Sequence, residues 1–229
     1  MTAAIKHKNP GFTLIELSVV LVVIGLVVAG VLMGRDLIED AQTKKTIKSL
    51  ESFRTAYYTF RGKYNGIPGD IRTPNVFWPE IGSIEGDGNG YIDGDIANEP
   101  SYAWMQLALA GLVIIDMPTP STYVYGIAPT ATSATFWYYR DYTGALASRQ
   151  GNSIHISGIP TVTDAAAGIT ALQGQQIDRK LDNGMPESGK IWGLAPVVAG
   201  LSIDSCADIT GYAVLGDNEL DCRMMYIIE

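Results

Sequence analysis

An apolar segment near the N-terminus constrains the fold of this chain more than any other feature. Phe12 to Gly34 reads FTLIELSVVLVVIGLVVAGVLMG, and its only ionisable side chain is Glu16. The 18 residues from Leu17 to Gly34 carry no charge. As a helix they span about 27 Å, at roughly 1.5 Å per residue, which is close to a bilayer core of roughly 30 Å. The segment therefore predicts a transmembrane helix.

A short basic stretch precedes this helix and sets its orientation. Residues 1–11 include Lys6, His7 and Lys8. Positive residues on the near side of an apolar helix predict that this end stays cytoplasmic and that the remainder is exported. A cleaved secretory signal peptide would look similar, but no A-x-A-like site follows the apolar run, which continues into a segment, RDLIED over 35–40, with four charged residues. A plain single-pass anchor is the stronger alternative, although it does not explain Glu16.

The composition, and the absence of known catalytic motifs, argue against several classes of function. The 229 residues carry a formal net charge of −8, which disfavours binding to nucleic acid. Two cysteines and two histidines (His7 and His155) disfavour a zinc enzyme. The sequence has no Gly-x-Ser-x-Gly element and no Gly-x-x-x-x-Gly-Lys followed by Ser or Thr, and a lone histidine such as His155 is more often packed or exposed than catalytic. We therefore expect a protein that is not an enzyme.

The residues around Glu16 carry a motif. A carboxylate in an apolar helix is costly and by default indicates a function with a partner. The sequence KNPGFTLIEL, from Lys8 to Leu17, resembles the prepilin processing motif of type IV pilins and type II secretion pseudopilins. In that family a membrane peptidase cuts after the glycine and N-methylates the new terminal residue. The resemblance implies cleavage between Gly11 and Phe12, a methylated Phe12, and Glu16 at the family's acidic position.

The chemistry of this motif suggests how subunits would find their register. Cleavage before Phe12 creates an α-amine with an unperturbed pKa of about 7.7 to 8.0, which is largely cationic near neutrality. When helices pack side by side, Glu16 of one subunit can pair with the Phe12 amine of a neighbour. An unpaired buried charge is expensive, so this pairing would penalise a wrong axial register. We expect Phe12 and Glu16 to act together in assembly.

The resemblance also implies partners and a location. The expected partners are prepilin peptidase, like subunits in a filament, an inner-membrane assembly platform and membrane lipid. The protein would first be a single-pass inner-membrane protein with a periplasmic head. It would then enter an extracellular pilus or a periplasmic pseudopilus.

The domain organisation follows from the helix pattern. Apolar residues recur at spacings of three or four from Ile47 to Phe60, which predicts that one helix continues from about residue 13 to 61, with Gly62 as its stop. The predicted parts are a leader over 1–11, an apolar helix half over 12–34, an amphipathic half over 35–62 and a head over 63–229. We expect an α+β, pilin-like fold in which a long N-terminal helix packs on a small antiparallel sheet.

The head contains weaker signals for individual elements. Residues 62–99 are rich in Gly, Pro and Asp and predict a loop. Helices are predicted over 101–112, with Ser101 as the cap, and over 164–181. Strands are predicted over 122–127, 134–142, 152–156 and 191–195. The aromatic residues expected in the core are Trp78, Trp104, Trp137, Tyr138 and Tyr139.

Two cysteines lie near the C-terminus. If the head is exported, its compartment is oxidising, and a disulfide between Cys206 and Cys222 is the expected state. Two free buried cysteines are the alternative. Many pilins have a C-terminal disulfide-bounded loop in this position, so the resemblance agrees with the bond.

An acidic, glycine-rich segment is a candidate calcium site. When Gly90 is aligned with the tight-turn glycine of an EF-hand-type loop, oxygen-bearing residues fall at the ligand positions. The match is partial, since the twelfth position is Ile96 and Asp95 or Glu99 would have to replace it. The candidate ligands are Glu85, Asp87, Asn89, the Tyr91 carbonyl, Asp93 and Asp95.

Two alternatives to this site stay open. A bare acidic turn solvated by water explains the same residues. A rival cation site, less favoured, is formed by Asp217, Asn218, Glu219 and Asp221. No cofactor is required by the sequence, and Ca²⁺ is the candidate ion.

The function expected from the sequence is that of a prepilin-like structural subunit of a type IV pilus or a related filament. Within the family, the alternatives are a pseudopilin of a type II secretion system and a minor pilin. Outside it, the alternative is a single-pass anchored module that binds calcium or another ligand and never polymerises.

Overall fold

A computed structural model describes residues 11–79, 85–92, 99–114, 135–139, 151–158, 168–194, 197–198, 201–202, 206–208, 211–213 and 222–228. The chain divides into two compact units, Met1–Ala41 and Gln42–Glu229, and each is described by itself. The predicted strand over 122–127 and the rival acidic cluster over 217–221 lie outside the described residues.

The N-terminal helix α1 begins at Leu14 and ends at Tyr64. The sequence predicted a single helix of this kind, but the predicted end at Gly62 is wrong. The chain leaves the helix at Asn65, which has a φ of 50°. Asparagine tolerates this left-handed conformation, whereas most residues with a Cβ do not. Gly62 continues the last turn instead, and apart from its own helix no atom lies within 4 Å of the position its Cβ would take.

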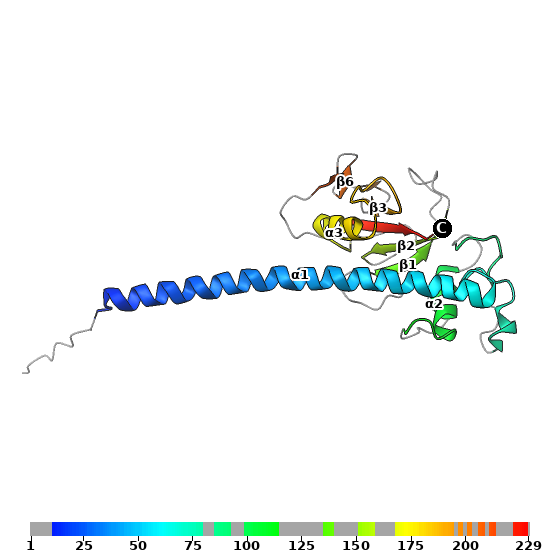
Figure 1. Ribbon diagram of the computed structural model, residues 1–229, viewed down its shortest axis with the longest axis horizontal. Coiled ribbons are helices and arrows are strands. Elements are labelled where there is room, and N and C mark those ends of the chain that lie inside the picture. The colour runs from blue at the N-terminus through cyan, green and yellow to red at the C-terminus, as the bar shows by residue number, and fades with distance from the viewer. Residues whose placement is uncertain are drawn as a thin grey trace, which may run out of the picture. The chain divides into compact units, whose positions relative to one another are not determined.

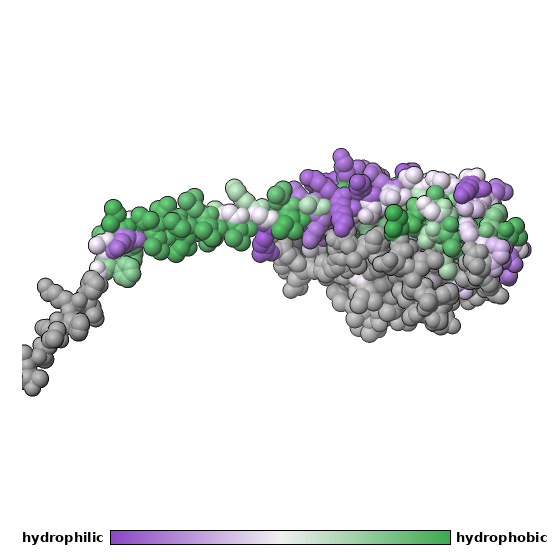
Figure 2. Space-filling view, turned by 90° about the horizontal axis from the view of Figure 1, so that it is seen from below, coloured by the Kyte–Doolittle hydropathy of each residue, from purple (hydrophilic) through white to green (hydrophobic). Residues whose placement is uncertain are grey.

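The first unit exposes an apolar surface. Every large hydrophobic side chain described between Phe12 and Ile38 is more than half exposed, from 52% at Val23 and Val28 to 87% at Phe12 and Leu14. Figure 2 shows this part of α1 as a mostly hydrophobic surface, with a small hydrophilic patch near its start. In water such a surface is unstable, so it requires lipid or other protein around it. Among the described residues, α1 is the one helix long and apolar enough to cross a membrane.

The second unit is built on a four-stranded antiparallel sheet in the order β1-β2-β8-β3. Three of its strands were predicted: β1 (Thr135–Tyr139), β2 (Ser153–Ser157) and β3 (Ile191–Leu194). The strand β8 (Arg223–Ile227) was missed, although it lies between β2 and β3. The smaller elements are η1 (Pro74–Val76), β4 (Val197–Val198) paired with β5 (Leu201–Ser202), and β6 (Ala207–Asp208) paired with β7 (Gly211–Tyr212).

The core lies between the sheet and the part of α1 that belongs to the second unit (Figure 1). The Phe53 ring from α1 packs edge-on against Trp104, with centroids 4.8 Å apart, and against Phe136 of β1, at 5.2 Å. Alternate residues of the paired strands line the same face of the sheet, since the side-chain period of a strand is two. Those buried on this face are Phe136, Ile154, Ile156, Ile191, Met224 and Tyr226.

Two aromatic predictions are confirmed, since Trp104 is fully buried and Trp78 is 7% exposed. The side chains of Trp137, Tyr138 and Tyr139 lie outside the described residues. The four-stranded antiparallel sheet and the helices packed against it confirm the predicted α+β head.

The helix α2 (Glu99–Leu109) starts two residues earlier than predicted. Ser101 therefore lies inside the helix, and its prediction as the cap is wrong. Pro100 occupies the first turn, where its missing N–H costs nothing. After the helix, Gly111 has a φ of 70°.

The helix α3 (Ala171–Leu181) does not include residues 168–170, which the prediction of 164–181 had placed in a helix, while residues 164–167 lie outside the described residues. The reason is a capping box: the Thr170 side chain accepts a bond from the Gln173 N–H, and the Gln173 side chain accepts one from the Thr170 N–H. Just before it, Ile169 forms a β-bridge with Cys222 and is extended. Because Ile169 is paired as a strand residue, the helix can begin only after it.

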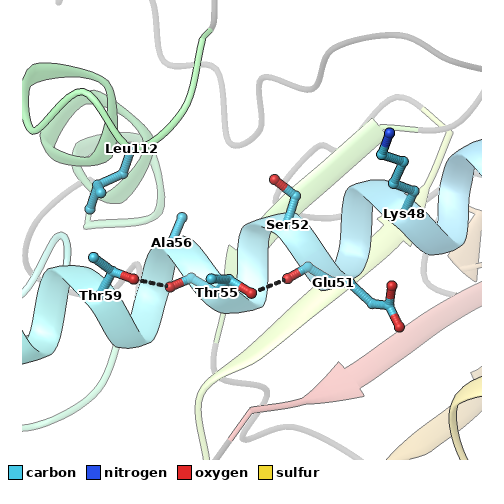
Figure 3. A pocket seen from close by; sticks show the side chains of 7 residues that line it. All are labelled: Lys48, Glu51, Ser52, Thr55, Ala56, Thr59 and Leu112. Atoms are coloured by element: carbon cyan, nitrogen blue, oxygen red, sulfur yellow. Dashed lines mark hydrogen bonds between the residues drawn. The ribbon is translucent and has the colours of Figure 1, made fainter.

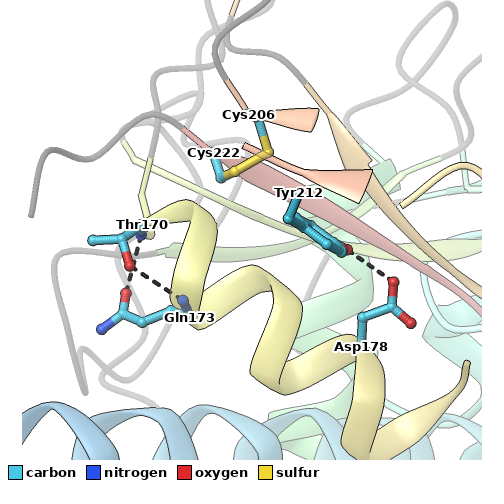
Figure 4. The surroundings of a disulfide bond; sticks show 6 residues. All are labelled: Thr170, Gln173, Asp178, Cys206, Tyr212 and Cys222. Atoms are coloured by element: carbon cyan, nitrogen blue, oxygen red, sulfur yellow. Dashed lines mark hydrogen bonds between the residues drawn. A yellow bond between two sulfur atoms is a disulfide. The ribbon is translucent and has the colours of Figure 1, made fainter. Parts of the chain in front are cut away.

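The predicted disulfide joins Cys206 to Cys222, and both residues are fully buried (Figure 4). Beside it, the Tyr212 hydroxyl donates to Asp178 Oδ2 of α3 at 2.9 Å. Burial, with the neighbouring Asp178 carboxylate, raises the pKa of the Tyr212 hydroxyl, so it stays a donor. The bond and this pair together hold the C-terminal segment on α3.

One buried asparagine fastens the loop 85–92 to the rest of the second unit. Asn152 is 1% exposed, and its Oδ1 accepts the Ile92 N–H at 2.8 Å. Its Nδ2 donates to the Tyr57 hydroxyl of α1 at 3.0 Å and to the Gly90 carbonyl at 3.1 Å. The loop therefore has a fixed position against α1.

Candidate processing and assembly site

The predicted cleavage point lies in an exposed segment before α1. Gly11 and Phe12 precede the helix and are both exposed. Apart from its chain neighbours, no atom lies within 4 Å of the position that a Cβ at Gly11 would take. A peptidase can therefore reach the Gly11–Phe12 bond without unfolding α1. Cleavage at this bond stays a prediction.

Glu16 takes part in a capping box at the start of α1, which the sequence analysis missed. Its Oε2 accepts the Thr13 N–H at 2.9 Å and the Thr13 hydroxyl at 2.8 Å. In return, the Glu16 N–H donates to the Thr13 hydroxyl oxygen at 3.3 Å. The signal that could have found it is the spacing Thr-x-x-Glu before an apolar run. The acid therefore has a local structural role as well as the expected one in assembly.

This capping leaves half of the carboxylate open. Both Thr13 donors use Oε2, and within the described part of the chain no hydrogen bond to Glu16 Oε1 is recorded. A carboxylate can accept several donors at once. The capped Glu16 can therefore still receive an amine from a neighbouring chain, and the cap holds it in place for that contact.

Three carboxylates of the second unit come together near the predicted calcium loop. Asp70, Asp87 and Glu99 each place an oxygen within 4.8 Å of the other two. Asp70 is 6% exposed and Glu99 is 1% exposed. The Asp70 oxygens accept the N–H groups of Asn89 and Gly90, and burial raises the pKa of Asp70 despite these bonds.

This cluster revises the predicted ligand set. Asp87 belongs to it, and so does Glu99, which was one of the two replacements considered for the twelfth position. Asp70 was missed because it lies well before the loop in sequence. Of the other predicted ligands, Glu85 is exposed, and the Asn89 side chain donates to Asp87 Oδ2 at 2.8 Å. Asp93 and Asp95 lie outside the described residues.

The geometry of the cluster fits a hard cation. Ligand oxygens lie about 2.3–2.6 Å from Ca²⁺, so two oxygens on one ion are at most about 5 Å apart. The three carboxylates satisfy this limit. If Ca²⁺ binds, Asp70, Asp87 and Glu99 are the residues that would hold it.

A groove lies between α1 and the segment that follows α2, within the second unit (Figure 3). Its volume is about 370 Å³. The hydroxyls of Thr55 and Thr59 donate to carbonyls of their own helix, at 2.8 Å and 2.7 Å, so neither is activated as a nucleophile. The groove is lined by Lys48, Glu51, Ser52, Thr55, Ala56, Thr59 and Leu112. These residues include no histidine, no cysteine and no pair of carboxylates.

His155 is packed in the sheet, which is one of the two placements expected for a lone histidine. It is 1% exposed on β2, with its Nε2 2.9 Å from the Ser153 hydroxyl oxygen. Burial, with the positive charge of Arg223 on β8 as a second cause, lowers the pKa of His155 to about 3. His7 lies in the predicted leader, so His155 is the only histidine of the predicted mature chain.

We expect the protein to lose stability in acid through His155. The unfolded histidine has a pKa of about 6.5, so as the pH falls from there towards 3 the unfolded state gains a proton that the folded state does not. This contribution is present above pH 6.5 and is lost at ~1.4 kcal/mol per pH unit below about pH 5.5. Urea unfolding between pH 7 and 4, compared with the His155→Gln variant, measures it. Equal pH dependence in both proteins would contradict the prediction.

The comparisons with known proteins identify the N-terminal segment. Residues 6–32 match the family model described as the prokaryotic N-terminal methylation motif. No curated protein and no solved structure matches the chain. The motif implies processing by prepilin peptidase and polymerisation with like subunits. The apolar α1 also fits a single-pass membrane anchor. The N-terminal segment of this chain therefore carries the methylation motif that marks prepilin substrates of the type IV pilin and pseudopilin kind.

Proposed function

We propose that this protein is a structural subunit of a type IV pilus or a related filament, processed at Gly11–Phe12 and polymerised through α1. The observation that carries the proposal is the methylation motif over residues 6–32. The role is mechanical rather than catalytic.

Two features of the structure support polymerisation through α1. The apolar side chains from Phe12 to Ile38 are exposed on all sides of the helix, so neighbouring helices or lipid can cover them. The Thr13–Glu16 cap leaves Glu16 Oε1 open to a partner. A neighbour's Phe12 amine would supply the missing positive charge.

Mass spectrometry of the N-terminus tests processing. In cells that have a prepilin peptidase, the protein is expected to begin at N-methylated Phe12 in both the membrane and the sheared surface fractions. In cells without the peptidase, the same protein is expected to keep Met1–Gly11. A functional protein that keeps its leader in peptidase-containing cells would contradict the proposal and would favour the plain anchor.

Fractionation separates the members of the family. An extracellular pilus subunit is expected in the sheared fraction, whereas a pseudopilin of a type II secretion system stays in the cell envelope. Its abundance relative to other subunits distinguishes a major from a minor pilin. We favour the pilus, with the pseudopilin or minor pilin as the second reading and a non-polymerising anchored module as the third.

A second candidate function is calcium binding by Asp70, Asp87 and Glu99. The geometric observation that favours it is the gathering of three oxygens within 4.8 Å, two of them on carboxylates that are nearly fully buried. Carboxylate oxygens gathered at this spacing are the ligands that Ca²⁺ prefers. Since Asn152 ties the adjacent loop to α1, the ion would stabilise the second unit as a whole.

Calcium titration of the mature full-length protein in detergent tests this function. At 100 times its dissociation constant, Ca²⁺ is expected to stabilise the protein by ~2.7 kcal/mol, seen as a rise in the melting temperature. The Asp87→Asn variant is expected to lose most of the shift, and Glu187→Gln, a change of an exposed acid elsewhere, to keep it. An absence of both heat and thermal shift in the unmodified protein would contradict calcium binding.

A further inference from the structure

Three asparagines in this chain are followed directly by glycine: Asn65, Asn89 and Asn183. Such pairs are prone to deamidation, because the glycine nitrogen can attack the asparagine side-chain carbonyl with no side chain in the way. The attack requires a glycine N–H that is free of other bonds and an asparagine side chain that is free to turn. The structure treats the three pairs differently.

The Asn89–Gly90 pair is held on both sides. The Gly90 N–H donates to Asp70 Oδ2 at 2.8 Å, and Asp70 is nearly fully buried. The Asn89 Nδ2 donates to Asp87 Oδ2 at 2.8 Å, while its Oδ1 accepts the Tyr91 N–H at 2.7 Å. Both the nucleophile and the electrophile are therefore engaged.

The Asn183–Gly184 pair is held in the same way by different residues. The Gly184 N–H donates to Oδ1 of the fully buried Asp178 at 2.9 Å. The Asn183 Nδ2 donates to the Ser188 hydroxyl at 2.9 Å, and its Oδ1 accepts the Met185 N–H at 2.8 Å. Hydrogen bonds to a charged acceptor are the strong ones, so this pair is also protected.

The Asn65–Gly66 pair has no such restraint. Asn65 is exposed just after α1 and bonds through its own N–H to the Arg61 carbonyl at 2.9 Å. Within the described ranges, no hydrogen bond is recorded for the Asn65 side chain or for the Gly66 N–H. Its φ of 50° also places it outside the helix, where the local backbone opens most easily.

We propose that Asn65 is the site at which the folded protein deamidates. The Gly66 nitrogen loses its proton and attacks Asn65 Cγ, and ammonia leaves, which forms a cyclic succinimide. Water then opens the ring at one of its two carbonyls and gives either aspartate or isoaspartate. No catalyst, oxidant or reductant takes part.

The product changes the end of α1. It places a carboxylate next to the C-terminal carbonyls of the helix, where negative charge is unfavourable. Arg61 and Lys63 in the last turn carry the opposite charge and partly compensate for the new carboxylate. The isoaspartyl form adds one carbon to the main chain at the turn that leaves the helix.

Peptide mass spectrometry of the mature full-length protein in detergent tests the proposal, after incubation at mildly alkaline pH. Trypsin releases Asn65 in the peptide Tyr64–Arg72 and Asn183 in Leu181–Lys190, and a second protease resolves Asn89. In the folded protein, Asn65 is expected to deamidate at least about tenfold faster than the other two, since each of them must first break a bond to a carboxylate. In urea the three rates are expected to converge.

The Asn65→Gly variant is the matched control. Glycine adopts a positive φ readily, so this variant is expected to keep the unfolding midpoint while losing the modification at this position. Folded-state rates at Asn65 no faster than at Asn89 and Asn183 would overturn the proposal. An equal excess at Asn65 in urea would overturn it too, because local sequence and not the fold would then cause the difference.

Discussion

Replacement of Glu16 by glutamine is expected to abolish filament assembly while leaving membrane insertion and processing intact. The substitution keeps a side-chain oxygen that can accept the Thr13 donors, so the cap and the start of α1 are preserved. It removes only the charge that a neighbour's Phe12 amine would meet. Cationic amines left without a counter-charge in an apolar bundle are strongly disfavoured. Sheared filaments, counted by electron microscopy and by immunoblot, measure the loss.

Two further variants separate the charge from the cap. Thr13→Val keeps the shape of the side chain but removes the hydroxyl, so it weakens the cap by ~1 kcal/mol and leaves the Glu16 charge in place. This variant is expected to assemble. Glu16→Leu loses the charge and the two bonds that the Glu16 side chain accepts from Thr13, and it is expected to fail like glutamine.

Each outcome of this series has a clear meaning. Normal filaments from Glu16→Gln would remove the registry role of the charge. Failure of Thr13→Val together with assembly of Glu16→Gln would show that helix capping, and not ion pairing, is what assembly requires. The appearance of Phe12 as the N-terminus in every variant confirms that processing was not the step affected.

Removal of the disulfide is expected to cost ~3 kcal/mol of unfolding free energy. The bond between Cys206 and Cys222 closes a loop with a sequence separation of 16, and without it the unfolded chain gains conformational entropy. Both cysteines are fully buried, so a replacement must be small and apolar. Double substitution to alanine, Cys206→Ala with Cys222→Ala, meets this condition. Urea unfolding followed by circular dichroism measures the difference.

A reductant provides the control for this prediction. Reduction of the unmodified protein is expected to lower its unfolding midpoint towards that of the double variant, which should not respond to reductant at all. The pairing of Cys222 with Ile169, and the Tyr212–Asp178 bond, do not depend on the sulfur atoms and are expected to stay in both proteins. An unfolding midpoint that neither treatment changes would show that these contacts hold the C-terminal segment without the disulfide.

Local signals in the sequence located several elements of the head correctly. The strands β1, β2 and β3 follow β-branched and aromatic runs, and the prediction of a single long helix follows the spacing of Ile47 to Phe60. Boundaries were less accurate where two interactions compete. At Ile169 and Thr170, bridge formation with Cys222 and the capping box delay α3, and neither effect can be read from the helical periodicity of residues 164–181.

The central strand β8 illustrates a different limit. Its sequence RMMYI contains two methionines and no alternation of polar and apolar residues, because it is covered on both faces. Period-two patterning appears only when one face meets water. Its position between β2 and β3 depends on pairing with residues far away in the chain.

The N-terminal segment was determined by the sequence itself. One contiguous stretch contains the whole signal: the leader, the glycine, Phe12, Glu16 and the uncharged run. The match over residues 6–32 agrees with this. Only the tertiary structure decided that Asp70 and Glu99 join Asp87, and that Asn65, unlike Asn89 and Asn183, is left unrestrained. Those outcomes depend on which groups, distant in the sequence, the folded chain brings close together. That distance in space cannot be predicted from the spacing of residues along the sequence.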